Sequence, residues 1–146
     1  LAVGLGADAS IADAHRSRYL TESMLKTPDL ILAMSREHRR RMVDLSPVRL
    51  RTTVTVREFA RLAGDASDEQ IVAAADAAGD DPSSRLRAAI GIVAAQRGVS
   101  APPADPNDDD VVDPYRRAWS VYEESGAQLE PGAAAVERVV RLALTR

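Results

Sequence analysis

Two patterns of apolar positions alternate along the chain, and they predict strands that are each followed by a helix. Residues 30–34 form a continuous apolar run with polar residues on both sides, which is typical of a strand buried on both faces of a parallel sheet. Residues 52–56 are β-branched throughout and favour a second strand. Helical segments follow, to about Leu45 and about Leu62. This order predicts an α/β domain wound right-handedly around a parallel sheet.

Polar residues and prolines set the other predicted boundaries. Thr21 is expected to cap a short helix that ends before Pro28, and Ser35 is expected to cap the helix after the first strand. Residues 67–70 have the spacing of a capping box and predict a further helix. Another helix is predicted from residue 81 to residue 97, with a glycine after its last turn.

A loop rich in proline and aspartate, residues 101–110, leads to an Asp-Pro pair. A residue before proline is held out of the right-handed helical region, and proline at a first helical position has its φ angle preset. Asp113 is therefore predicted to cap a final helix that runs from Pro114 toward Thr145. A proline is expected to interrupt this helix within residues 126–132.

Composition and charge indicate what kind of core the chain forms and which classes of partner it is expected to lack. The 146 residues are 45% hydrophobic but only 3% aromatic, so a single core must be built from Ala, Leu, Val and Ile. The net charge of −3 argues against nucleic acid as a partner, and the arginines of the helix after residue 35 are expected on a solvated face. No apolar run approaches the roughly 20 residues that cross a bilayer, and no signal peptide is evident. We expect a cytoplasmic protein with no membrane partner.

The residue inventory also restricts the chemistry. The chain has no cysteine, so these residues supply no thiol nucleophile, disulfide or Cys-ligated zinc. His15 and His38 fall in different predicted elements and belong to no spaced metal motif. The acidic segment 105–116 begins with the spacing of a calcium-binding loop but lacks its glycine and its final glutamate. We predict no metal and no cofactor.

Five short segments follow one another in an informative order: His15-Arg16-Ser17-Arg18, Thr21-Glu22, residues 28–38, Arg57-Glu58-Phe59 and Asp113-Pro114-Tyr115. Together they resemble the low-molecular-weight protein tyrosine phosphatase family, over about residues 2–60 and 110–144. The resemblance implies a three-layer α/β/α fold with a small parallel sheet of order 2-1-3-4. Residues 1–146 would then form a single domain of this type, with residues 64–106 as a helical insert within it.

The resemblance also implies an activity, the hydrolysis of phosphotyrosine or another aryl phosphate monoester through a cysteinyl-phosphate. Asp113 corresponds to the proton donor, because a phenol has a pKa of about 10 and leaves more readily when a carboxylic acid protonates it. Tyr115 corresponds to the aromatic wall beside the substrate ring. His15 corresponds to the histidine that braces the phosphate loop, and Arg18 lies in the same supporting segment. The substrate would be a phosphotyrosine protein or a small aryl phosphate.

The chain departs from the family in three ways. It lacks the cysteine and arginine of the phosphate loop, it lacks the first strand, and Arg116-Arg117 stand where the family usually has a glycine. Leu1 in what reads as the middle of a helix leads us to expect an upstream segment of about forty residues that supplies the missing parts. The chain as given is expected to be inactive. The alternatives are a non-catalytic interaction module and, third, an arsenate reductase, whose chemistry also requires thiols.

Overall fold

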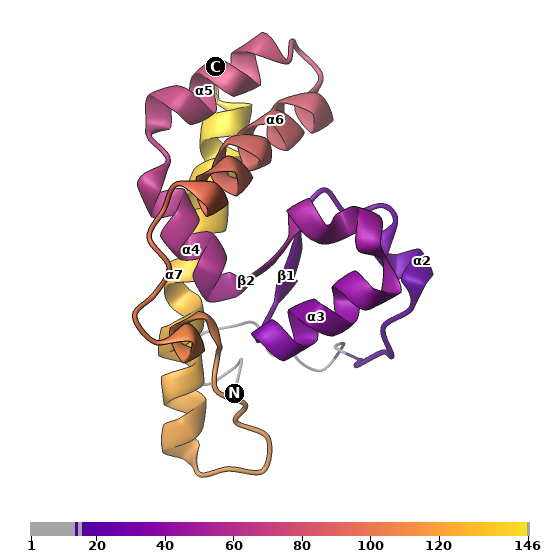
Figure 1. Ribbon diagram of the computed structural model, residues 1–146, viewed down its shortest axis with the longest axis vertical. Coiled ribbons are helices and arrows are strands. Elements are labelled where there is room, and N and C mark those ends of the chain that lie inside the picture. Colours follow the sequence, from indigo (N-terminus) through magenta and orange to yellow (C-terminus); the bar gives the residue numbers. More distant parts are fainter. Residues whose placement is uncertain (1–13, 15, 146) are drawn as a thin grey trace.

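The computed structural model describes residues 14 and 16–145, and they form a predominantly helical fold with one small sheet (Figure 1). The helix expected around Leu1 and the predicted site residue His15 lie outside the described residues. In chain order the elements are α2 Glu22–Leu25, β1 Ile31–Ala33, α3 Arg36–Leu45, η2 Pro47–Thr52, β2 Thr53–Thr55, α4 Val56–Asp65, α5 Asp68–Ala77, α6 Pro82–Ala95, η3 Gln96–Gly98, η4 Pro106–Asp109 and α7 Trp119–Leu144.

The two predicted strands are confirmed, and they pair in parallel. Ile31 lies opposite Thr53, and Ala33 lies opposite Thr55. All of β2 is buried, as are the two outer residues of β1, which explains why both segments are apolar or β-branched at every position. Helix α3 packs on the strand pair, and α4 follows β2 on the side of the larger helical group (Figure 1).

The predicted three-layer fold with a sheet of order 2-1-3-4 is wrong for this structure. The sheet of the described chain has two strands, in the order β1-β2, and helices make up most of the remainder. The physical reason lies in the sequence itself. Residues 30–34 and 52–56 are the runs that suit a buried strand, whereas the Ala-rich segments from residue 68 onward have high helix propensity.

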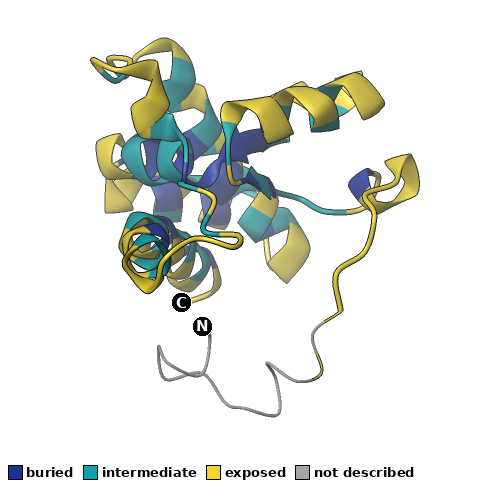
Figure 2. Ribbon diagram, turned by 90° about the horizontal axis from the view of Figure 1, so that it is seen from below, coloured by how far each residue is buried: buried dark blue, intermediate teal, exposed yellow. Residues whose placement is uncertain are grey.

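The core lies mainly within the helical group and extends to the sheet through Val54 of β2 (Figure 2). Its largest fully buried apolar side chains are Phe59, Leu62, Ile71, Val54, Val93 and Val139. Helices α5 and α6, which occupy most of the 64–106 segment, pack against each other and against α7. The segment is therefore part of the main core. No helix in the described part of the chain is both long enough and apolar enough to cross a membrane.

Side-chain caps hold the starts of four helices and confirm the predicted starts of α3, α5 and α6, whereas the side chain of the predicted cap Thr21 makes no capping hydrogen bond to the backbone of α2. Ser35, Ser67 and Asp81 each accept a hydrogen bond from the backbone N–H three residues later, at the starts of α3, α5 and α6. Thr55 does the same for α4 and completes a capping box with Glu58. These caps satisfy backbone donors that would otherwise have no partner in the first helical turn.

The predicted start and interruption of the last helix are both wrong. Helix α7 begins at Trp119, because Arg116 has a φ of 57°, which ends any right-handed helix begun at Pro114. The helix then continues through Pro131 to Leu144. Its glycine at position 132 serves packing, since a Cβ atom there would meet the Val56 side chain of α4 and lie 3.0 Å from the Val56 carbonyl oxygen.

Candidate functional site

Residues 108–115, called the acid loop below, cross the carboxyl ends of the strands. The backbone N–H of Val111 donates to the carbonyl oxygen of Met34, the residue after β1, at 2.8 Å. The side chain of Val111 is buried. One residue further, the N–H of Val112 donates to Oε1 of Gln128 on α7 at 2.8 Å. The loop is therefore bonded to the sheet on one side and to the last helix on the other.

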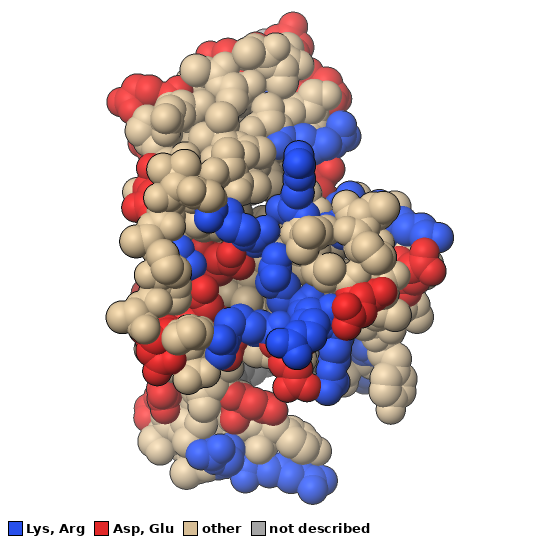
Figure 3. Space-filling view, viewed as in Figure 1, with Lys and Arg blue, Asp and Glu red and all other residues tan. Residues whose placement is uncertain are grey.

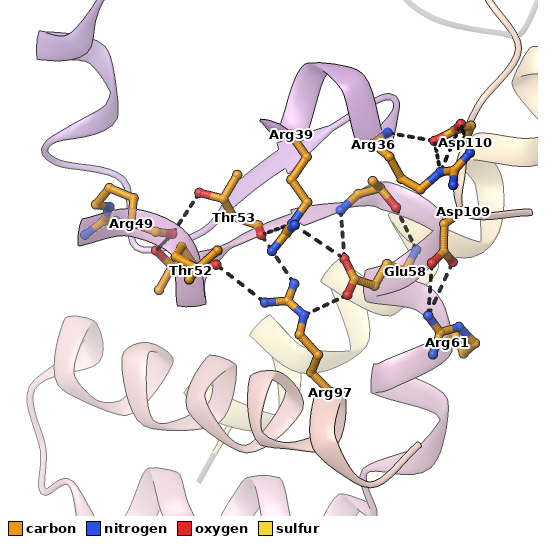
Figure 4. A network of polar contacts seen from close by, with 12 residues as sticks. Arg36, Arg39, Arg49, Thr52, Thr53, Glu58, Arg61, Arg97, Asp109 and Asp110 are labelled. Atoms are coloured by element: carbon orange, nitrogen blue, oxygen red, sulfur yellow. Dashed lines mark hydrogen bonds and ion pairs between the residues drawn. The ribbon is translucent and has the colours of Figure 1, made fainter. Parts of the chain in front are cut away.

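Asp110 anchors the loop to the first residue of α3 (Figure 4). Its Oδ1 accepts the backbone N–H of Arg36 at 2.7 Å, and its Oδ2 accepts Nη2 of Arg36 at 3.1 Å. Its carbonyl oxygen accepts Nη1 of Arg57, from α4, at 2.9 Å. The negative charge also suits the positive end of the α3 dipole.

These contacts decide the protonation state of Asp110. Partial burial raises its pKa, but the hydrogen bonds from the Arg36 side chain and backbone outweigh burial, and the charges of Arg36 and Arg57 act in the same direction. The pKa of Asp110 therefore lies below its ordinary value. A carboxyl group held ionised in this way is an anchor and is poorly suited to donate a proton.

Asp109 is a second anchor of the acid loop. Its carboxylate accepts Nη2 of Arg61, on α4, at 3.1 Å, and both side chains are largely buried. The neighbouring Asp108 is exposed, and both acids line a cavity of about 570 Å³ between α4, η4 and α7. The sequence interpretation missed these anchors, because it expected Arg36 to be solvated and assigned no partner to Arg61.

Asp113 and Tyr115, the two predicted site residues of the loop, are in direct contact. The backbone N–H of Tyr115 donates to Oδ1 of Asp113 at 2.9 Å, and Oδ2 accepts no hydrogen bond from the described residues. Asp113 is exposed, and the Tyr115 side chain is 68% exposed. The guanidinium carbon of Arg116 lies 5.1 Å from the centre of the Tyr115 ring, a cation–π contact. Asp113 thus caps a turn and leaves one carboxylate oxygen open to solvent.

The other predicted site residues are not brought to this pair. His15 lies outside the described residues. Arg18 is exposed in a segment without helix or strand, and within the described residues it makes no hydrogen bond or ion pair with the acid loop. The supporting role that the resemblance implies for these two residues therefore stays a prediction.

Arg116 occupies the backbone conformation that glycine adopts most readily. The family that the sequence resembles usually has a glycine soon after Asp-Pro-Tyr, where this chain has Arg116. An arginine in this conformation costs roughly 1–2 kcal/mol relative to a right-handed one. Its stacking on Tyr115 offsets part of that cost.

No group of three or more His, Asp or Glu side chains in the described part of the chain is placed to hold a metal ion. Two of the three consecutive aspartates at 108–110 instead face arginines. The arrangement offers a fixed loop at the strand ends with one exposed carboxylate next to an aromatic ring.

No family model, curated protein or solved structure matches the chain. The resemblance to the phosphatase family therefore depends on the sequence segments named above alone.

Proposed function

We propose that the acid loop belongs to an aryl phosphate monoesterase of the protein tyrosine phosphatase type. Asp113 is the proton donor and Tyr115 lies beside the substrate ring. One observation supports this more than any other. Val111 is bonded to Met34 at the carboxyl end of β1, and ligands of open α/β sheets bind outside the carboxyl ends of the strands.

Asp110 and Asp113 have different roles in this proposal. Asp110 anchors the loop, and Asp113 transfers the proton. Asp110 is ionised and bonded to Arg36, whereas Asp113 is exposed and has a free oxygen. As the bond between phosphorus and the phenolic oxygen breaks, the carboxylic acid of Asp113 gives its proton to that oxygen. The resulting carboxylate then takes a proton from the water molecule that hydrolyses the phosphoenzyme.

The nucleophile of this reaction is a cysteine thiolate, and the 146 residues contain none. The proposal therefore places the nucleophile outside them. Two forms should be compared, namely the 146-residue chain and the product of the whole reading frame that encodes it. We expect the 146-residue chain to leave phenyl phosphate intact and the longer product to hydrolyse it.

The residue roles are tested in the longer product. Asp113→Asn should lower kcat for phenyl phosphate by about 10²–10⁴-fold, the usual contribution of a general acid. The matched control is Asp108→Asn, an exposed acid of the same loop, which should leave kcat unchanged. Turnover by the 146-residue chain at enzymatic rates would show that the nucleophile has been misassigned.

A different result would favour the alternative of a non-catalytic module. In that case both forms bind a phosphotyrosine peptide without any turnover, and Asp113→Asn does not change the affinity. Equal kcat values for Asp113→Asn and Asp108→Asn would leave Asp113 as the cap of a turn.

A further inference from the structure

A second cavity, of about 520 Å³, lies at the opposite, amino ends of the strands. Asp29, two residues before β1, and Thr52, immediately before β2, both line it. Helix α6 forms one wall, and the small or apolar lining residues of that wall are Ile90, Gly91, Ala94 and Ala95. Because the acid loop lies at the carboxyl ends, this cavity is independent of the proposed phosphatase site.

Arginine dominates the charged lining of the cavity. Four arginines line it, and they are Arg49, Arg51, Arg87 and Arg97. Asp29 is the one acidic residue among the described residues of the lining, and its Oδ1 accepts Nε of Arg87 at 2.8 Å. Basic side chains gather along the middle of the face shown in Figure 3, where the lobe that carries α3 adjoins the helical group.

Of the other three arginines of the lining, one is paired with a carboxylate and two are not. Arg97 donates from Nε to Glu58 at 2.7 Å (Figure 4). Arg49 donates to the carbonyl oxygen of Pro28, but its buried Nε has no hydrogen-bond partner. Arg51 is exposed, and within the described residues it makes no hydrogen bond or ion pair. Among the described residues, no carboxylate therefore pairs with Arg49 or Arg51.

Arg39, which does not line the cavity itself, adds a further positive charge next to Arg97. Glu58 is shared between Arg97 and Arg39, whose Nε lies 4.0 Å from Oε2 of Glu58. Burial and the nearby charge of Arg97 lower the pKa of Arg39, as expected where guanidinium groups are crowded. Arg39 and the four arginines of the lining thus bring five guanidinium groups to this region, and within the described residues only three of them, Arg39, Arg87 and Arg97, have a carboxylate partner, Asp29 or Glu58. An anion bound in the cavity would reduce the electrostatic repulsion among these guanidinium groups.

We propose that the cavity binds a multiply charged organic phosphate, with its phosphate groups on Arg49 and Arg51. Guanidinium groups bind phosphate oxygens through paired hydrogen bonds, and two unbalanced arginines suit an anion with at least two charges. Small-ligand sites have volumes of about 300–1,000 Å³, so the cavity also accepts an organic part. The small and apolar residues of the α6 wall around Gly91 suit an organic ring, and a nucleoside diphosphate combines such a ring with two phosphates.

Titration calorimetry of the 146-residue chain with ADP, AMP, adenosine, pyrophosphate and citrate tests the proposal. ADP should bind most tightly and adenosine should not bind, because the arginines recognise the phosphates. Pyrophosphate should bind more weakly than ADP, because it does not contact the α6 wall. No binding of ADP, or citrate binding as tightly as ADP, would overturn the proposal of an organic phosphate site.

Two pairs of variants locate the site. Arg51→Gln should weaken ADP binding by about 10- to 100-fold, the loss expected for a charged hydrogen bond. Arg40→Gln, the same charge change on the exposed face of α3, is the control and should have no effect. If the two variants reduce affinity equally, the attraction comes from general charge and the proposed site is wrong.

The second pair fills space without removing charge. A Cβ atom at Gly91 meets no protein atom within 4 Å, and Gly91 lines the cavity, so we expect Gly91→Leu to occupy cavity space and to weaken ADP binding strongly. Gly64→Leu is the control, since Gly64 also has nothing within 4 Å and does not line the cavity. Thermal unfolding should show that both variants fold. Undiminished binding in a folded Gly91→Leu variant would exclude this cavity as the binding site.

Discussion

The carboxylate of Asp110 accepts the backbone N–H of Arg36 at 2.7 Å, which ties the acid loop to the first residue of α3. The two residues are 74 positions apart in the sequence. Asp110→Ala removes this bond together with the bonds to the Arg36 side chain. We expect the loop to loosen while the helical core stays folded, because the core side chains lie elsewhere.

Limited proteolysis measures this loosening. Trypsin cleaves after arginine, and Arg116 and Arg117 are exposed just beyond the anchor. In Asp110→Ala, cleavage after these residues should be several-fold faster, whereas Asp108→Ala should match the native chain. Unchanged cleavage in Asp110→Ala would mean that the bonds from Val111 and Val112 hold the loop without Asp110.

Stability at acid pH should depend on Glu58. Burial raises the pKa of Glu58, but the hydrogen bond from Arg97, the charges of Arg97 and Arg39 and the Thr55 backbone outweigh it, so the pKa lies below its ordinary 4.5. Because the pKa is lower in the folded state, the stabilisation is complete above about pH 4.5 and is lost as the pH falls through the folded pKa.

Urea unfolding of the native chain and Glu58→Gln at several pH values checks this expectation. At pH 7 the variant should lose about 2–3 kcal/mol, because a largely buried charged hydrogen bond is removed. The difference between the two proteins should shrink below pH 4.5. Glu130→Gln, at an exposed position of α7, should show no difference at any pH.

Arg85 holds the far end of the helical group together. It is 5% exposed, and it donates to the carbonyl oxygens of Ala143 at 2.7 Å and Gly79 at 3.2 Å. Arg85→Met keeps the length of the side chain but leaves these acceptors unpaired. We expect a loss of about 2–4 kcal/mol in the free energy of unfolding, measured by chemical denaturation. Arg40→Met, on a solvated helix face, should change stability by less than about 0.5 kcal/mol.

Two glycines in helices should respond in opposite ways to alanine. Gly132→Ala should destabilise the fold by about 1–3 kcal/mol, because its Cβ would meet Val56 across the contact between α7 and α4. Gly91→Ala should stabilise it by up to about 1 kcal/mol, because nothing lies within 4 Å and alanine favours helix. Thermal unfolding measures both. A stable Gly132→Ala variant would show that α7 can move away from α4.

The sequence predicted the elements that depend on local patterns. Both strands and the capped helices α3, α5 and α6 follow from runs of apolar residues and from residues such as Ser35 and Ser67, whose bonds reach only three positions away. The last helix was predicted poorly for a tertiary reason. Pro131 and the glycine after it look like breakers, but the glycine allows α4 to approach closely.

The acid loop shows a second limit of sequence patterns. Asp113 and Tyr115 are neighbours in the chain, so their association could be predicted. The partners of Asp110 could not, because Arg36 is 74 residues away and carries no signal that separates a pairing arginine from a solvated one. The cavity at the amino ends of the strands was missed for the same reason, since its lining comes from residues 29, 49–52 and 87–97.

The most direct test of the central claim is the leaving-group dependence of hydrolysis by the product of the whole reading frame. If Asp113 protonates the departing phenol, Asp113→Asn should slow phenyl phosphate by about 10²–10⁴-fold. The same variant should slow p-nitrophenyl phosphate far less, because its more acidic phenol leaves without a proton. An equal loss of kcat for both substrates, or no loss for either, would contradict the assignment of Asp113 as the proton donor.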